Sequence, residues 1–334
     1  MIAVRLLTHR REPVDDAMIN ARVRAAVLYR KQQMRQDTDS YRLIFAEADR
    51  LPGVIADLFG DTVILQILAL GMERWQDLII ATLLDEVKPR RLILKNDEPV
   101  REKEGLPLYR KVCFGDDIDQ VIICENGLHL AVDLAHGQKT GYFLDQKANH
   151  ARLRAYAPGK TVLDCFCYSG GFAMNAAAAG ASRVTAVDMS QDAVSLAKAN
   201  AARNGMADQI NFIAANAFDF LRQSVNDRAS YDVIVLDPPA FAKSHAARAA
   251  ARRGYKEINL SAFRLLGPGG ILATHSCSFH MPEDLFVETV LEAARDAQRI
   301  VRILELRRQD FDHPVLAGYP ESHYLKSLWL QVIE

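Results

Sequence analysis

Two neighbouring apolar stretches in the C-terminal part of the chain each run into side chains that can do chemistry. They end in residues 235–241 (VLDPPAF) and 274–278 (THSCS). Two prolines fix the backbone and remove two N–H donors, so the Asp237 carboxylate would be held rigidly at the end of its strand. The thiol of Cys277 is a candidate nucleophile, although a buried, inert thiol is the commoner fate of a free cysteine. The residues alone favour a functional Asp237 over a structural turn, and they leave the role of Cys277 open.

A small-residue loop between a strand and a helix provides a second candidate site at residues 164–171 (DCFCYSGG). Glycine lets the backbone approach a ligand closely. A ligand here would lie at the carboxyl edge of a sheet, near a switch in strand order. The spacing is not GxGxxG, so a dinucleotide pyrophosphate is disfavoured. Because a Gly-Gly pair is usually only a turn, this loop alone is weak evidence.

The next two strands also end in polar side chains. Asp188 can accept hydrogen bonds from both hydroxyls of a ribose. The alternative is that it caps the following helix, but Ser190 can serve as that cap, which favours the ribose role. Asn216 follows the third strand, where its amide could meet an adenine edge with Phe218 adding apolar packing. A plain turn residue is an equal alternative for Asn216.

Basic residues gather in two parts of the chain, although the formal net charge is only -1. One part is residues 1–36, and the other runs from Lys243 through Arg252 to Lys256. Locally basic surface suits a phosphate backbone, and a solvated helix face is an equal alternative for either cluster alone. Phe241 in addition offers a ring on which a base can stack.

The elements that must position these residues form two patterns. From residue 160 onward strands alternate with helices, which predicts a parallel sheet with right-handed crossovers. The strands are expected at 161–165, 184–187, 210–214, 231–236 and 270–274, with a helix at 255–266 and a terminal antiparallel pair at 301–306 and 325–333. Before this domain we expect a basic N-terminal segment at 1–36, a small α/β domain at 37–118, and a hairpin with a linking helix at 119–159. The N-terminal helix, at 18–36, should bury Ile19, Val23, Val27 and Leu28.

Length and composition bound the class of protein. A chain of 334 residues with 49% hydrophobic and 25% charged residues is typical of a soluble globular protein of about two domains. Five cysteines without a zinc or thioredoxin spacing fit a reduced, cytoplasmic setting and predict no metal site. The N-terminus lacks a signal-peptide core, and no apolar run approaches the ~18 residues of a membrane span.

Together these residues resemble the class I S-adenosylmethionine (SAM)-dependent large-subunit ribosomal RNA cytosine-5 methyltransferases, the RlmI-like family. The resemblance rests on residues 164–172, 188, 237–241 and 276–278, and it extends to 51–57, 96–105, 136–146 and 313–321. It implies a Rossmann-like methyltransferase domain at 160–334, with a mostly parallel seven-stranded sheet, after a small α/β central domain that binds RNA. SAM is the implied cofactor, and 23S-type ribosomal RNA is the implied partner.

The resemblance also distributes roles over the site. It implies that Cys277 is the nucleophile and that Asp237 is a second catalytic group. The cofactor-binding residues would be Asp164, Phe166, Tyr168, Ser169, Gly170, Asp188, Met189, Asn216, Ala217, Asp237 and Gln146. The substrate-binding residues would be Pro238, Pro239, Phe241, Lys243, Lys139, Tyr142 and Arg252.

Two features depart from the pattern of this family. Members usually carry a PUA RNA-binding domain before the central domain, and residues 1–15 could be at most its last strand. RNA affinity and target choice are the properties that this affects. Asn216 stands where relatives often have Asp. An amide oxygen can still accept from the adenine amino group, so we expect SAM binding to survive.

The expected reaction forms 5-methylcytosine. Cytosine C5 becomes nucleophilic only when a thiolate adds to C6, so the reaction needs a Cys and an acidic or hydrogen-bonding group near N3. Cys277 and Asp237 would be that pair, and the base must be unstacked to reach them. Methylation of a base nitrogen, which needs no thiol, is the nearest alternative. The other alternative is a non-catalytic RNA-binding or ribosome-assembly factor. The sequence does not decide between a monomer and a homodimer.

Overall fold

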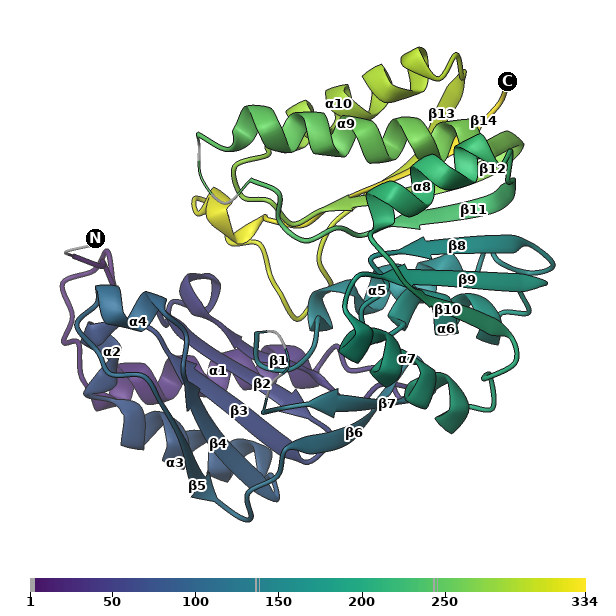
Figure 1. Ribbon diagram of the computed structural model, residues 1–334. Helices are drawn as coiled ribbons and strands as arrows, with labels where there is room; N and C mark the ends of the chain where they lie inside the picture. The colour runs from purple at the N-terminus through teal and green to yellow at the C-terminus, as the bar shows by residue number, and fades with distance from the viewer. Residues whose placement is uncertain (1–3, 136, 138, 243, 245) are drawn as a thin grey trace. The chain divides into compact units, whose positions relative to one another are not determined.

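The structure is a computed structural model that describes residues 4–334 except 136, 138, 243 and 245. The chain divides into two compact units (Figure 1). Unit 1 comprises residues 1–145 and 310–323, and unit 2 comprises residues 146–309 and 324–334. The predicted boundaries differ from this division, because they placed 310–323 in the methyltransferase domain and joined the hairpin at 119–145 to the linking helix.

Unit 1 is built on a sheet that, over the described residues, has five strands in the order β1-β2-β3-β4-β5. The strands are β1 (Tyr41–Phe45), β2 (Val54–Phe59), β3 (Thr62–Ile67), β4 (Arg91–Asn96) and β5 (Tyr109–Phe114). β3 and β4 are parallel, and the other pairs are antiparallel. The helices are α1 (Asp16–Lys31), α2 (Leu70–Glu73), α3 (Gln76–Val87) and α4 (Val100–Lys103). Apolar side chains of α1 and α3 pack with those of the sheet in one core.

The first helix differs from its prediction in what it buries. Asp15 caps α1 by accepting a hydrogen bond from the Met18 N–H at 3.0 Å. Leu28, which we expected in the core, is 55% exposed, whereas Arg22 and Arg30 are buried. Both guanidinium groups donate to backbone carbonyls, and these hydrogen bonds compensate the cost of burying them. Part of the N-terminal basic cluster is therefore structural.

The predicted hairpin is confirmed as β6 (Gln120–Glu125) and β7 (Leu128–Asp133). Asn126 and Gly127 between them have φ values of 53° and 75°. Two successive positive φ values are what a two-residue hairpin turn of type I′ requires, and Asn-Gly adopts them at low cost.

Unit 2 contains a mostly parallel sheet, as predicted, with seven strands in the described part of the chain. Its order is β10-β9-β8-β11-β12-β14-β13. The strands are β8 (Thr161–Cys165), β9 (Arg183–Asp188), β10 (Ile210–Ala214), β11 (Tyr231–Leu236), β12 (Leu266–Ser276), β13 (Val301–Arg307) and β14 (Lys326–Val332). β13 and β14 form the expected antiparallel pair.

Helices cover both faces of this sheet (Figure 1). On one face lie α5 (Lys147–Leu153), α6 (Gly171–Ala178) and α7 (Gln191–Arg203), and on the other α8 (Ala217–Asn226), α9 (Arg248–Leu265) and α10 (Glu283–Asp296). α9 begins at Arg248 rather than at the predicted residue 255, and α8 and α10 were not predicted. The chain leaves β8 in one direction along the sheet and returns to β11 on its other side, so the switch in strand order lies between β8 and β11.

Candidate active site

The loop after β8 has the backbone geometry of a ligand-binding turn. Phe166, Tyr168 and Gly170 have φ values of 66°, 47° and 89°. Two non-glycine residues in the left-handed region carry local strain, which is concentrated at functional sites. A Cβ at Gly170 would lie 3.3 Å from the Ala197 Cβ, so the loop also approaches α7 closely. Ser169 on this loop is buried.

Asp164 at the end of β8 is a buried carboxyl group with one partner on one oxygen. Its Oδ2 accepts from the Ala173 N–H at the start of α6, at 3.0 Å. Its Oδ1 has no hydrogen-bond partner among the residues that the structure describes. Burial, and to a lesser degree the Asp237 and Asp188 carboxylates, raises the pKa of Asp164 well above its usual range. This oxygen can accept a hydrogen bond from a cationic ligand group.

Gln146 offers an open hydrogen-bond donor, whereas Asp164 offers an open acceptor. It precedes α5, is 3% exposed, and its Oε1 accepts from the Asn149 amide at 2.7 Å. Its Nε2 lacks an acceptor within the described part of the chain. α5 packs against α6, where the His150 ring lies 4.5 Å from the Phe172 ring. A buried acceptor and a buried donor are thus left open on the face of the sheet covered by α5 and α6.

Asp188 at the end of β9 holds the loop after β8. Its two carboxylate oxygens accept from the Tyr168 N–H and the Ser190 N–H, each at 2.9 Å. Ser190 caps α7, as we expected, by accepting from the Ala193 N–H. Each carboxylate oxygen of Asp188 has a further lone pair for a hydroxyl donor. The neighbouring Met189 is 76% exposed, so its side chain is available to an apolar ligand surface.

Asn216 is a helix cap in the structure. Its side-chain oxygen accepts from the Phe218 N–H at 2.9 Å and the Asp219 N–H at 3.4 Å at the start of α8. The oxygen that we expected to accept from an adenine amino group is therefore already engaged. Ala217 is buried directly after it. Apolar contact from this loop, rather than the Asn216 oxygen, is what the geometry offers to a base.

The Asp-Pro-Pro loop follows β11, and its Phe241 belongs to an aromatic cluster. The Phe241 ring lies 4.7 Å from Tyr255, 5.7 Å from Phe218 and 6.4 Å from Phe166. The ring is half-buried, so only part of it is open to a stacked base. Pro238 is buried and Pro239 is exposed. Pro238 thus packs inside the protein, while Pro239 on the same loop is accessible to a ligand.

Cys277 follows β12 and lies between two clamped serines. The Tyr255 hydroxyl is 2.9 Å from both Ser276 Oγ and Ser278 Oγ, and Ser278 Oγ accepts from the Ala242 N–H at 3.2 Å. These bonds join the Cys277 loop to the Asp-Pro-Pro loop. Asp237 and Cys277 thus follow paired strands, with Leu236 opposite Thr274.

The thiols on this edge of the sheet differ in burial. Cys165 and Cys167 are buried, which raises the pKa of both thiols well above the usual range. Cys277 is half-buried. A buried thiol is a poor nucleophile because only the thiolate reacts. Cys277 is therefore the better placed of these thiols for attack on a substrate.

The predicted substrate-binding residues fare differently. Arg252 pairs with Glu292 at 2.5 Å and Glu288 at 3.1 Å on α10, so its charge is neutralised within unit 2. In unit 1, Tyr142 is 3% exposed, and Lys139 pairs with Asp145 at 3.0 Å. Lys243 lies outside the described residues. The structure therefore gives Arg252 and Tyr142 roles within the protein that compete with RNA contact.

Two residues of this region were missed in the sequence. Tyr255 clamps both serines, and Lys326 of β14 is buried with its ammonium group 2.7 Å from the Ser278 carbonyl. A lysine at the start of a mostly apolar strand was the available signal for Lys326. Within the described residues, no group of three or more His, Cys, Asp or Glu side chains is arranged to hold a metal ion. No helix in that part of the chain is sufficiently long and apolar to cross a membrane.

Known proteins match most of this chain. Residues 70–316 match the family model described as S-adenosylmethionine-dependent methyltransferase. A protein of Shewanella denitrificans named ribosomal RNA large subunit methyltransferase I is 42% identical over 335 residues, which cover 99% of this chain and 84% of that protein. Its namesake in Aeromonas hydrophila is 44% identical over 297 residues, which cover 88% of this chain and 75% of that protein.

Solved structures share the fold. A SAM-dependent methyltransferase from Streptococcus mutans superposes with a TM-score of 0.84 at 23% identity, covering 98% of this chain and 84% of that one. A methyltransferase crystallised with SAH gives a TM-score of 0.85 at 23% identity, with the same coverage.

The strand order and the carboxyl-edge loops are those of a SAM-dependent methyltransferase. Within that class, the chain belongs to the ribosomal RNA large subunit methyltransferase I family. The predicted fold, enzyme class and SAM cofactor are confirmed. The residues present fit this cofactor, because the open Asp164 oxygen and Gln146 amide match the ammonium and carboxylate of its methionine part.

Proposed function

We propose that this enzyme methylates C5 of a cytosine in large-subunit ribosomal RNA and that Cys277 forms a covalent adduct with the base. The observation that carries the proposal is the half-buried Cys277, which lies between two serines held by Tyr255. It follows β12, the strand paired with β11, and Asp237 follows β11. The relatives are named as methyltransferases of large-subunit ribosomal RNA, which supports the substrate class.

The cofactor would be held by groups of unit 2 alone. Asp164 Oδ1 would accept from its ammonium group, and Gln146 Nε2 would donate to its carboxylate. Asp188 would accept from the ribose hydroxyls, while Met189, Ala217 and the half-buried Phe218 would pack on the adenine. When bound, SAM supplies an electrophilic methyl group. The remaining steps depend on side chains that activate and hold the cytosine.

The reaction begins when the Cys277 thiolate adds to C6 and the C5=C6 double bond becomes an enamine. C5 then takes the methyl group and passes its proton to water. The electron pair of that C–H bond re-forms the C5=C6 double bond, and the C6–S bond breaks to return the thiolate. Asp237 would hold the N3 and N4 edge of the base. In its protonated form it would donate to N3, so that the negative charge developing on the ring in the adduct is stabilised. The cytosine must leave its stack to reach both groups.

Contact with the RNA backbone would come from exposed cations that form no ion pair with the residues that the structure describes. Arg253 on α9 is exposed and forms no ion pair with any residue that the structure describes, in contrast to its neighbour Arg252. Arg10 and Arg11 in unit 1 are likewise exposed. We propose that unit 1 binds RNA and that the enzyme acts in the cytoplasm, as the free cysteines suggest.

The direct test is to incubate the protein with tritiated SAM and large-subunit ribosomal RNA, then digest the RNA and identify the labelled nucleoside. We expect 5-methylcytosine. Cys277→Ala should abolish turnover while SAM binding, measured by calorimetry, stays intact. Cys113→Ala in unit 1 is the matched control and should retain activity.

Other outcomes separate the alternatives. A base methylated on nitrogen, formed equally by Cys277→Ala, would replace the proposed chemistry with direct nitrogen methylation. Binding of RNA without any labelled product would point to a non-catalytic factor.

A further inference from the structure

Lys326 is a buried cation next to the proposed nucleophile. It begins β14 directly opposite Ser276, the last residue of β12. Its side chain is 4% exposed, and its ammonium group donates to the carbonyls of Ser278 and Tyr324, both at 2.7 Å. The two residues that flank Cys277 therefore contact Lys326 through strand pairing or through a hydrogen bond.

A buried ammonium group is costly unless something compensates its charge. Lys326 forms no ion pair with a carboxylate among the described residues, and two neutral carbonyls satisfy only two of its three protons. Burial lowers the pKa of Lys326 to about 8, and the interactions with Cys277 and then Glu283 oppose that shift. Lys326 is thus mostly protonated at neutral pH, and Cys277 is the main group that favours its charge.

Among the described residues, the other titratable groups that interact with this pair supply no positive charge. Tyr255 on α9 stays neutral, because burial raises its pKa to about 12. Glu283 at the start of α10 is an acid, which disfavours a second negative charge nearby. Of the described groups that interact with Cys277, Lys326 is the cation.

We propose that Lys326 is a positioning residue that stabilises the Cys277 thiolate before it attacks C6 and again when it leaves the methylated base. The proposal rests on the role of Cys277 as nucleophile, which is itself proposed above. A thiolate is the reactive form of cysteine, and an adjacent ammonium group increases its fraction at neutral pH. The structural alternative is that Lys326 only ties the loop at Ser278 to β14.

The pH dependence of Cys277 alkylation separates these two roles. The full-length protein, without SAM or RNA, is treated with iodoacetamide between pH 5 and 10, and modification of the Cys277 peptide is followed by mass spectrometry. In the wild type we expect a midpoint below the value of about 8.5 for a free thiol. In Lys326→Met the midpoint should rise by about one to three pH units, which slows alkylation at pH 7 by about tenfold or more.

Two further variants control for structure. Tyr255→Phe removes the hydroxyl that clamps Ser276 and Ser278 but leaves the charge, so the midpoint should stay near that of the wild type. Lys326→Arg keeps a cation and should restore the low midpoint. Equal shifts in Lys326→Met and Tyr255→Phe would overturn the proposal in favour of a purely structural role.

The wild type alone also tests the inference if Lys326→Met does not fold. A midpoint at or above that of a free thiol would overturn it. The failure of the proposed function looks different, because there Cys277→Ala would keep methyltransferase activity whatever the alkylation midpoint of the wild type is.

Discussion

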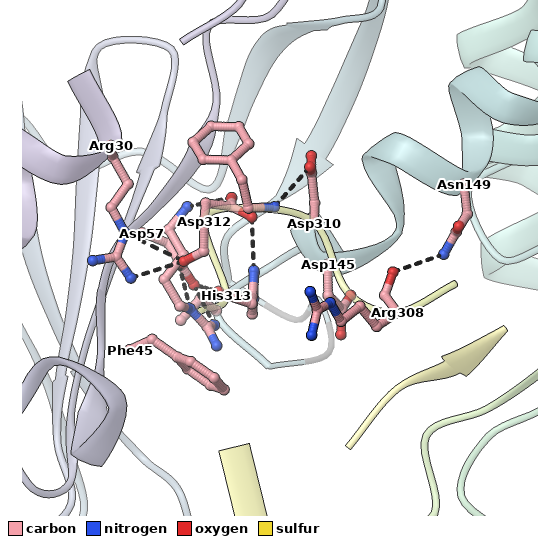
Figure 2. Close-up of polar contacts among 12 residues, drawn as sticks. Arg30, Phe45, Asp57, Asp145, Asn149, Arg308, Asp310, Asp312 and His313 are labelled. Atoms are coloured by element: carbon pink, nitrogen blue, oxygen red, sulfur yellow. Dashed lines mark hydrogen bonds and ion pairs between the residues drawn. The ribbon is translucent and has the colours of Figure 1, made fainter. Parts of the chain in front are cut away.

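Two buried polar clusters, one in each unit of this enzyme, differ in how fully their hydrogen bonds are satisfied. In unit 1, Asp57 is fully buried and accepts two hydrogen bonds from Arg42, each at 2.8 Å, and one from Thr140 at 2.6 Å. Asp312 accepts from the Arg42 N–H and pairs with His313, each at 2.8 Å. Figure 2 shows Arg30, Asp57, Asp312 and His313 of this cluster together, with the Arg30 guanidinium bonded to the Asp312 carbonyl.

In unit 2, several buried polar atoms near the carboxyl edge have no hydrogen-bond partner among the described residues. Asp164 Oδ1, Gln146 Nε2 and both ring nitrogens of His275 form no hydrogen bond within the described chain. Asp164 and His275 lie on the same face of the sheet, because Asp164 is in register with Ala273 through Val235 and side chains alternate along each strand. Burying such groups without partners destabilises a fold, so a site that keeps them is suited to a ligand. The comparison therefore separates a hydrogen-bonded polar cluster in unit 1 from a cluster in unit 2 whose open groups are suited to a ligand, which we propose is SAM.

The largest effect that tests this difference is expected at Asp57. Asp57→Asn removes the carboxylate that pairs with the buried Arg42 guanidinium, which should reduce the free energy of unfolding of unit 1 by about 3–5 kcal/mol. Urea unfolding followed by hydrogen exchange, read peptide by peptide, measures the loss in unit 1. Asp85→Asn breaks the exposed Arg24–Asp85 pair at 2.8 Å and should cost less than about 1 kcal/mol. If Asp57→Asn leaves unit 1 as stable as the wild type, the cluster around Asp57 does not stabilise this unit.

Asp164→Asn should leave the stability of the fold nearly unchanged but should lower the affinity for SAM. The neutral amide can keep the bond from the Ala173 N–H, and it removes a carboxyl group whose pKa burial raises. It should weaken SAM binding by about tenfold to a hundredfold, the loss expected for one hydrogen bond to a charged group. Calorimetry measures this affinity, and thermal unfolding without SAM checks the fold.

Asp232→Asn is the matched control for Asp164→Asn. Asp232 lies at the amino end of β11, away from the ligand edge, where its carboxylate accepts from the Thr161 N–H at 2.8 Å. Its replacement should leave SAM affinity unchanged. Equal losses of affinity in both variants would mean that Asp164 acts through stability and not through the ligand.

The sequence predicted unit 2 well because local pattern and tertiary position agree there. Each central strand is an apolar run that ends in a polar residue, and parallel strands bring those ends to one edge. The loop at 164–171, Asp188, Asp237 and Cys277 were all placed at that edge from the pattern alone. The roles assigned to them remain proposals.

The errors arise where a partner is distant in the sequence. Arg30 was counted as part of a basic surface, but it is bonded to Asp312, 282 residues away. The same bonds to Asp312 bring residues 310–323 into unit 1, which no local pattern shows. Arg252 was assigned to RNA as part of the basic segment 243–256, but it pairs with Glu288 and Glu292 on α10, a helix that was not predicted.

The smallest expected effect is on the pH dependence of stability and concerns His275. It tests whether the ring nitrogens of His275, like Asp164 Oδ1 and Gln146 Nε2, contact the ligand. Burial, with contributions from His150 and Arg307, lowers the pKa of His275 to about 3 from its usual 6.5. The unfolded chain therefore binds a proton below pH 6.5 that the folded chain cannot, so this contribution to stability is complete above pH 6.5 and is lost as pH falls toward 3. The loss is about 1.4 kcal/mol per pH unit over that window.

His275→Phe should remove this part of the acid sensitivity, since a phenyl ring suits the neighbouring Phe172 and Trp329 rings and binds no proton. Urea unfolding at pH 7.5, 6.5 and 5.5 gives the slope, and His129→Gln, at an exposed histidine of unit 1, should keep the wild-type slope. If SAM affinity is unchanged in His275→Phe, the His275 nitrogens are buried only because the ring packs there. The open polar atoms that bind SAM are then those of Asp164 and Gln146. If affinity falls as in Asp164→Asn, the histidine nitrogens belong to the ligand site as well, because packing among aromatic rings alone would not couple them to SAM.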